Sequence, residues 1–78
     1  MESIKIFSYN TQYLNIEESE SNHPNMADKR LTLTSNDNSI CFDVLGKNVR
    51  IFTDKVDISL NTLELRIMRD FLTKCIDF

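Results

Sequence analysis

Glycine, proline and histidine are scarce in this sequence, with one residue of each, and tryptophan is absent. A phosphate-binding loop needs several glycines so that backbone N–H groups can approach the phosphate, so this class of site is excluded. Cys41 and Cys75 lie far apart and neither belongs to a Cys-x-x-Cys motif, so the chain lacks the ligands of a structural zinc site. We therefore expect no metal, no cofactor and two free cysteines in a reducing compartment.

The sequence also lacks long apolar runs and an excess of positive charge. No run approaches the roughly 20 apolar residues that a membrane helix requires, and the first ten residues, MESIKIFSYN, lack the basic and apolar regions of a secretory signal. Nine Lys and Arg residues stand against twelve Asp and Glu residues, for a net charge of -3. Because nucleic-acid binding depends on clustered basic residues, we predict a cytoplasmic protein that binds neither membranes nor nucleic acid directly.

The overall composition is that of a folded domain. The 78 residues are 41% hydrophobic and 27% charged, which predicts a single small domain. A chain of this length buries only about 60% of its unfolded surface, so its margin of stability is thin. Small size therefore favours association with a partner or with itself, as in a homodimer.

Alternating apolar and polar residues predict four strands and leave a fifth open. The predicted strands span residues 3–9, 30–35, 39–44 and 49–53. In the first, Ile4 and Ile6 are expected to share one face. The turn sequence SNDNS and the turn around Gly46 connect the last three strands into an antiparallel meander with one apolar face. Residues 54–58 add either a short strand or an extended connection.

A helix is predicted over residues 62–76. Asn61 and Glu64 have the spacing of a capping box, in which each side chain accepts a hydrogen bond from the other residue's backbone N–H. Leu63, Ile67 and Phe71 then recur at helical spacing. The predicted fold is a small two-layer α+β domain, with an antiparallel β-sheet (β-loop-β-β-β) covered on one face by this single C-terminal α-helix.

Residues 15–29 are predicted to form an acidic loop, because Glu, Ser, Asn and Asp dominate without periodicity. Glu17, Glu18 and Glu20 are its main charges, and His23 precedes Pro24. Two interpretations remain open for this segment. It is either a solvated tether or an acidic contact for a protein partner with a basic surface.

Two apolar features suggest further contacts. By alternation, Phe52 faces away from the helix-covered side of the sheet, beside Cys41, and together with Tyr9 or Phe7 it would form a partly apolar patch suited to a dimer or a partner. A register shift of one residue would reverse this assignment. Phe78, the last residue, either tucks against the core or serves as an aromatic anchor.

The sequence offers little for catalysis. A nucleophile needs a base within hydrogen-bond reach, and Cys41 or Cys75 with His23 is the one available pairing. No local motif supports this pairing, so we expect that the protein is not an enzyme. A small hydrolase remains the alternative from a different class, and full activity of a His23→Ala variant would remove it.

The predicted function is therefore a non-enzymatic protein-binding inhibitor or modulator. Small acidic proteins encoded by phages or mobile elements and directed at host defence or nucleic-acid-processing complexes fit this profile, and such a protein would act in the host cytoplasm. The alternative within the same class is an immunity or accessory subunit that pairs through the sheet face. The candidate partner-binding residues are Glu17, Glu18, Glu20, Cys41, Phe52 and Phe78.

Overall fold

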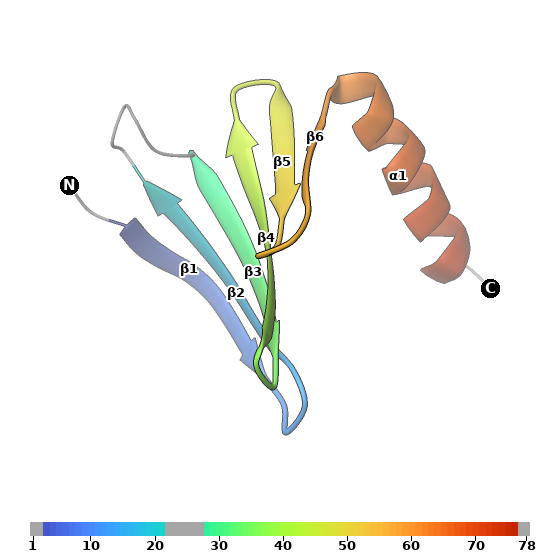
Figure 1. The fold of residues 1–78 in the computed structure, drawn as a ribbon. Coiled ribbons are helices and arrows are strands. Elements are labelled where there is room, and N and C mark those ends of the chain that lie inside the picture. The colour runs from blue at the N-terminus through green and yellow to red at the C-terminus, as the bar shows by residue number, and fades with distance from the viewer. Residues whose placement is uncertain (1–2, 22–27, 77–78) are drawn as a thin grey trace.

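The computed structural model describes residues 3–21 and 28–76, which form six strands followed by one helix (Figure 1). The strands are β1 (Ser3–Asn10), β2 (Asn15–Ser21), β3 (Lys29–Ser35), β4 (Asn38–Leu45), β5 (Asn48–Phe52) and β6 (Asp57–Leu60). The helix is α1 (Thr62–Ile76).

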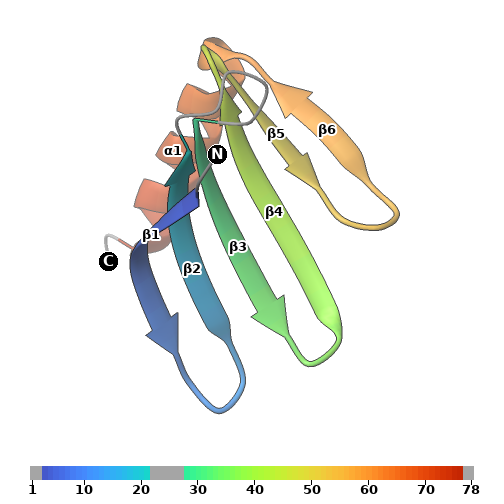
Figure 2. The same ribbon diagram turned by 90° about the vertical axis from the view of Figure 1, so that its left-hand side faces the viewer.

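All six strands belong to one antiparallel sheet. Their order in space is β1-β2-β3-β4-β5-β6, so each strand pairs with the next along the chain (Figure 2). Short connections suit this order, because an antiparallel neighbour can be reached by a tight turn. The prediction of a small α+β domain with an antiparallel sheet and a single C-terminal helix is confirmed.

Two of the tight turns require a left-handed backbone conformation. Gly46 has φ of 65° and opens the two-residue connection between β4 and β5. Asn36 has φ of 56° at the equivalent position between β3 and β4. Glycine adopts positive φ without steric cost and asparagine tolerates it better than most residues, so the sequence fixes both turn positions.

The prediction of a loop over residues 15–29 is wrong for its first half, because Asn15–Ser21 forms β2. Ile16 is the only apolar residue of this strand, so no apolar alternation marks it in the sequence. The strand instead lies between β1 and β3 and pairs with both of them. β2 is therefore stabilised mainly by backbone hydrogen bonds to the strands on both sides, and less by packing of its mostly polar side chains.

The first strand also departs from regular alternation. The register shifts between Lys5 and Phe7, which leaves Ile6 as the extra residue of a β-bulge. Ile4 therefore shares a face with Phe7. Because the register gives Ile6 no partner, the expectation that Ile4 and Ile6 share one face stays a prediction. A bulge on an edge strand locally disrupts the ladder and so discourages pairing with other chains at that edge.

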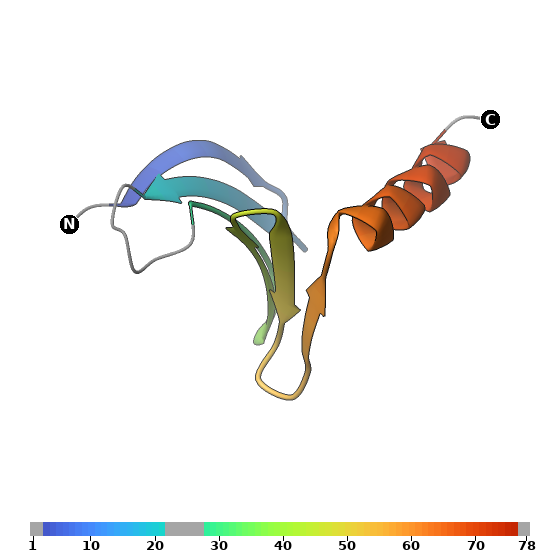
Figure 3. The ribbon, with the colours of Figure 1, turned by 90° about the horizontal axis from the view of Figure 1, so that it is seen from above.

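The helix begins and ends at the predicted residues. The backbone N–H of Asn61 donates to Glu64 Oε1 at 2.8 Å, and the backbone N–H of Glu64 donates to Asn61 Oδ1 at 2.9 Å, so the predicted capping box is confirmed. The helix packs against the β6 edge of the sheet and then leads away from the strands (Figures 1 and 3). The helix therefore covers a smaller part of the sheet than the sequence predicts.

The described residues contain no fully buried apolar side chain. Among them, only Asp43 is buried, with 5% of its surface exposed. The apolar residues in the middle of the sheet are half-buried, and those of β1 and α1 are mostly exposed. The folded chain therefore leaves most of its apolar surface open.

Candidate functional site

One face of the sheet carries apolar residues from all six strands, together with Glu18, Glu20 and Lys29, and we call it the apolar sheet face. Its members share one side because directly paired residues of neighbouring strands point to the same face. The apolar residues placed there by the strand register are Ile4, Phe7, Tyr9, Ile16, Leu31, Leu33, Ile40, Phe42, Val44, Val49, Ile51, Ile58 and Leu60. A contiguous apolar surface of this extent on a folded chain usually marks a contact with another molecule.

The apolar sheet face is hollowed at the end where β3 meets β4. An open hollow of about 310 Å³ lies there, and its surface is almost entirely apolar. Its lining residues are Leu14, Leu33, Ser35, Asn38, Ser39, Ile40 and Thr53. Because it is shallow and apolar, it suits an apolar side chain of a partner better than a polar small molecule.

The three predicted acidic contacts do not lie together. Since they belong to a strand, Glu18 and Glu20 point to the apolar sheet face and Glu17 points to the opposite face. Glu17 pairs with Lys5 Nζ at 3.1 Å on that opposite side. Among the described residues, neither Glu18 nor Glu20 forms an ion pair. Glu18 lies within the apolar sheet face between Phe7 and Leu31, and Glu20 lies opposite Lys29 on the same face.

The opposite face of the sheet, which we call the charged face, carries a row of ion pairs. Arg30 donates two hydrogen bonds to Asp43, at 2.6 and 2.7 Å. Arg50 donates two to Asp57, at 2.9 and 2.7 Å. The hydrogen bonds with Asp43 are the main cause that raises the pKa of Arg30, and those with Asp57 likewise raise the pKa of Arg50. These arginines are neutralised by partners within the chain.

The structure places Phe52 and Cys41 side by side on the charged face, as the sequence predicts. The two residues are direct cross-strand partners, and together they line an open hollow of about 270 Å³. The guanidinium of Arg50 lies 4.4 Å from the centre of the Phe52 ring, and that of Arg30 lies 5.7 Å away. Such cation–π contacts hold the half-buried ring in place and account for its position without a partner.

The Arg50–Asp57 pair makes the β5–β6 hairpin sensitive to acid. Hydrogen bonding from Arg50 is the main cause that lowers the pKa of Asp57 below its ordinary value of 3.8, despite an opposing effect of partial burial. A carboxylate with a lowered pKa in the folded state stabilises that state above pH 3.8, and this stabilisation is lost as the pH falls through the lowered pKa. The paired hairpin should therefore weaken only below pH 3.8.

Carboxyl chemical shifts measured by NMR during an acid titration test this prediction. The variant Arg50→Met should raise the pKa of Asp57 toward 3.8. The matched variant Arg69→Met removes an arginine from the exposed surface of α1 and should leave the Asp57 titration unchanged. Equal midpoints for Asp57 in the Arg50→Met variant and the unmodified chain would contradict the assigned cause.

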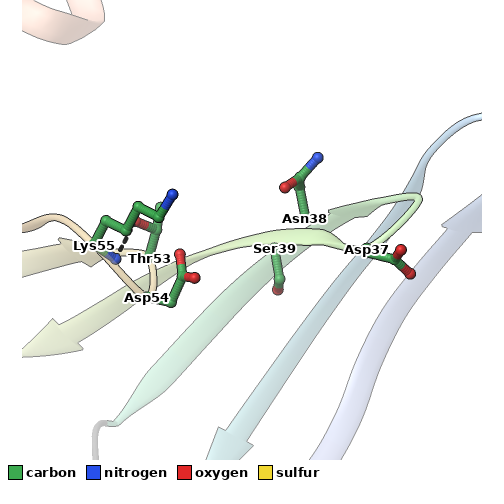
Figure 4. A pocket seen from close by; sticks show the side chains of 6 residues that line it. All are labelled: Asp37, Asn38, Ser39, Thr53, Asp54 and Lys55. Carbon is green, nitrogen blue, oxygen red and sulfur yellow. Dashed lines mark hydrogen bonds between the residues drawn. The ribbon is translucent and has the colours of Figure 1, made fainter.

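A second hollow, of about 390 Å³, lies between two turns at one end of the sheet (Figure 4). Its lining residues are Asp37, Asn38, Ser39, Thr53, Asp54 and Lys55. The hydroxyl of Thr53 accepts hydrogen bonds from the backbone N–H groups of Lys55 and Val56, so it serves to close its own turn. The side chains of Asp37 and Asp54 lie on separate turns and do not point toward one another (Figure 4). These two carboxylates are therefore not arranged to act together on a bound molecule.

The remaining predicted residues fall into two groups. His23 and Phe78 lie outside the described residues, so the proposed pairing of His23 with a cysteine and the role of Phe78 stay predictions. Cys75 is exposed on α1, and Cys41 contacts the Thr32 hydroxyl at 3.9 Å. Within residues 3–21 and 28–76, no three His, Cys, Asp or Glu side chains form a group that could hold a metal ion.

Sequence reasoning missed the apolar sheet face as a candidate site. Residues such as Leu31 and Phe42 show clear alternation, which identifies an apolar face but does not say whether a helix covers it. The same holds for Leu63, Ile67 and Phe71 of α1, which remain exposed. The periodicity of these apolar residues was visible in the sequence. Only the position of α1 shows that they form an open surface and not a buried core.

No protein-family model, no curated protein and no solved structure matches this chain. In the described part of the chain, no helix is both long enough and apolar enough to span a membrane.

Proposed function

We propose that this chain is a non-enzymatic protein-binding inhibitor or modulator, which acts by occupying a surface of another protein. One observation carries the proposal: the apolar sheet face extends over six strands and no apolar side chain among the described residues is buried. Exposed apolar surface is unfavourable in water at about 25 cal/mol per Å². Covering it with a protein partner is the contact that this surface favours most.

The chemistry of the surface suggests the character of the partner. Glu18 and Glu20 lie on the apolar sheet face, so the partner presents basic groups together with apolar side chains. The small size and mild acidity of the chain fit an inhibitor encoded by a phage or mobile element and directed at a host defence or nucleic-acid-processing complex in the host cytoplasm. This assignment rests on the general profile and on the proposed contact surface.

Neighbouring residues of β3 provide a matched test of the contact surface. Leu31 and Thr32 are both half-buried, and they point to opposite faces of the sheet. The unmodified chain, the Leu31→Asp variant and the Thr32→Asp variant would each be immobilised and exposed to lysate, and retained proteins identified by mass spectrometry. Proteins retained by the unmodified chain and by Thr32→Asp, but lost with Leu31→Asp, are the expected result.

Circular dichroism of each variant shows whether the sheet remains folded. If Leu31→Asp fails to fold, Ile58→Asp replaces it, because Ile58 lies on the same face and is 49% exposed. Ser59→Asp is then the control on the opposite face. Identical sets of retained proteins for the apolar-face variant and its control would contradict the proposal. A partner identified in this way would be assayed for its own activity with and without the chain, and inhibition or modulation is expected.

A further inference from the structure

The chain carries two apolar surfaces that it does not join. The first is the apolar sheet face. The second is a stripe on α1, formed by Leu63, Ile67 and Phe71, which are 64%, 62% and 61% exposed. We call this second surface the helix stripe. An amphipathic helix and a one-sided sheet are the two halves of an ordinary two-layer core, so each surface has the chemistry that the other requires.

The junction between β6 and α1 holds these two surfaces apart. Asn61 is the only residue between the strand and the helix. Its backbone carbonyl accepts a hydrogen bond from the Leu65 N–H at 2.9 Å, in addition to the two capping-box hydrogen bonds with Glu64. The Thr62 hydroxyl also donates to the backbone carbonyl of Lys47 at 3.4 Å, which attaches the first turn of α1 to the β4–β5 turn. A connection this short resists folding of α1 back over its own sheet.

The exposed area of the chain matches what a dimer would cover. A folded monomer of 9.1 kDa exposes about 4,900 Å² by the usual scaling of surface with mass. This chain exposes 6443 Å², an excess of about 1,500 Å² over that scaling. Its radius of gyration is 13.6 Å, against about 11.5 Å for a compact domain of this length. Two copies have about 3,000 Å² of excess surface, within the range of permanent homodimer interfaces.

We propose that two copies of this chain form a closed dimer by exchanging α1, so that the helix stripe of each copy docks on the apolar sheet face of the other. The proposal goes beyond the proposed function, because it names a second copy of the chain as an occupant that competes with another protein for the apolar sheet face. The exchange is reciprocal, so one two-fold axis relates both contacts and the assembly closes at two chains.

Charge complementarity supports a second copy as the occupant. Arg66, Asp70 and Lys74 form one row at i, i+4 spacing beside the helix stripe. Asp70 pairs with Arg69, and neither Arg66 nor Lys74 forms an ion pair within the described part of the chain. Glu18 and Glu20 lie on the apolar sheet face and are likewise without ion-pair partners among the described residues. In the exchanged dimer, the two cations without ion pairs on α1 of one copy meet the two carboxylates without ion pairs on β2 of the other.

Light scattering coupled to size-exclusion chromatography measures the first consequence. The unmodified chain should have the mass of two chains. Ile67→Asp introduces a charge into the helix stripe and should weaken dimerisation about a hundredfold, because an aspartate would be buried without a partner. Thr73→Asp changes the polar side of α1 and should leave the dimer intact. A single-chain mass for the unmodified protein at all concentrations would overturn the proposal, as would a dimer that Ile67→Asp leaves unchanged.

A mixing experiment distinguishes helix exchange from other dimers. Ile67→Asp disables the helix stripe and Leu31→Asp disables the apolar sheet face, so each variant alone should be a monomer. Mixed, they should form a two-chain species, because one intact helix stripe meets one intact sheet face. In a helix–helix dimer Leu31→Asp alone would still dimerise, and in a sheet–sheet dimer Ile67→Asp alone would still dimerise, so either result overturns the exchange. Absence of a mixed dimer also overturns it.

An insertion variant keeps the proposal testable if Leu31→Asp does not fold. A flexible Gly/Ser segment inserted between Leu60 and Asn61 should allow α1 to fold back over its own sheet and so produce a compact monomer. A dimer of unchanged stability in this variant argues against exchange.

The two proposals fail in different ways. If the unmodified chain is a monomer but Leu31→Asp still abolishes capture of another protein, only the dimer proposal is wrong. If Leu31→Asp alters neither the mass of the chain nor the set of captured proteins, both proposals are wrong.

Discussion

Replacing Arg30 with glutamine should destabilise the protein by about 2 to 3 kcal/mol, somewhat less than the roughly 3 to 5 kcal/mol lost when a fully buried ion pair is broken. The variant leaves Asp43 without its two hydrogen bonds from the guanidinium, and the side chain of Asp43 is only 7% exposed. A buried carboxylate without its partner carries the full cost of lost hydration. The expected loss of stability is smaller than for a fully buried pair because the Arg30 side chain is 46% exposed, so solvent already screens part of the interaction.

Substitution of the other partner in this ion pair, Asp43→Asn, provides the control. It should cost only about 1 kcal/mol, because the remaining arginine is partly exposed and can regain water. Urea unfolding followed by circular dichroism measures both free energies of unfolding, at equal protein concentration so that association affects each variant alike. An equal or smaller loss for Arg30→Gln than for Asp43→Asn would show that the burial of Asp43 does not govern this pair.

Reversing the charge of Glu18 and Glu20 together, to lysine, should weaken association about tenfold at low salt and should make the remaining association less sensitive to salt. Both residues lie on the apolar sheet face, where we expect the two cations without ion pairs on α1 of a second copy. In the variant, lysines would face Arg66 and Lys74. Repulsion between like charges then replaces attraction during the approach of the two chains.

Glu17→Lys is the matched control, because this residue lies in the same strand but points to the charged face. It loses only the ion pair with Lys5, whose two side chains are 60% and 40% exposed, so association should remain as in the unmodified chain. Sedimentation equilibrium at low and high salt measures the dissociation constants. If Glu17→Lys and the double variant weaken association equally, the acidic residues act through overall charge and the face on which they lie is irrelevant.

The contrast between these three glutamates shows how far sequence reasoning reached at the candidate site. Their charge and their closeness in the chain were evident, and both indicated an electrostatic contact. Their division between two faces was not evident, because a stretch of Glu and Ser with a single isoleucine carries no apolar alternation. Only the pairing of β2 with β1 and β3 determines that Glu18 and Glu17 point in opposite directions.

Other parts of the candidate site were predicted from local pattern. The alternation of Cys41 with Phe42, and of Ile51 with Phe52, correctly placed Cys41 and Phe52 on one face, and the register confirms them as direct partners. What the pattern did not predict is that Arg30 and Arg50 would lie against the Phe52 ring. Arg50 belongs to the same strand as Phe52, whereas Arg30 lies on β3, which is distant in sequence. Both contacts pack the ring that the sequence predicts to be part of an exposed patch.

By itself, the sequence determined the strands, the turns and the helix start that depend only on residues close together in the chain. Alternating side chains specify β3 to β5, Gly46 and Asn36 allow the two turns, and Asn61 with Glu64 starts α1 at Thr62. Only the tertiary structure decided that Asn15–Ser21 is a strand and that α1 packs at the β6 edge, leaving the apolar sheet face open. The physical reason is that both depend on contacts between separate segments. Hydrogen bonds from two neighbouring strands form β2, and the one-residue junction at Asn61 sets the direction of α1.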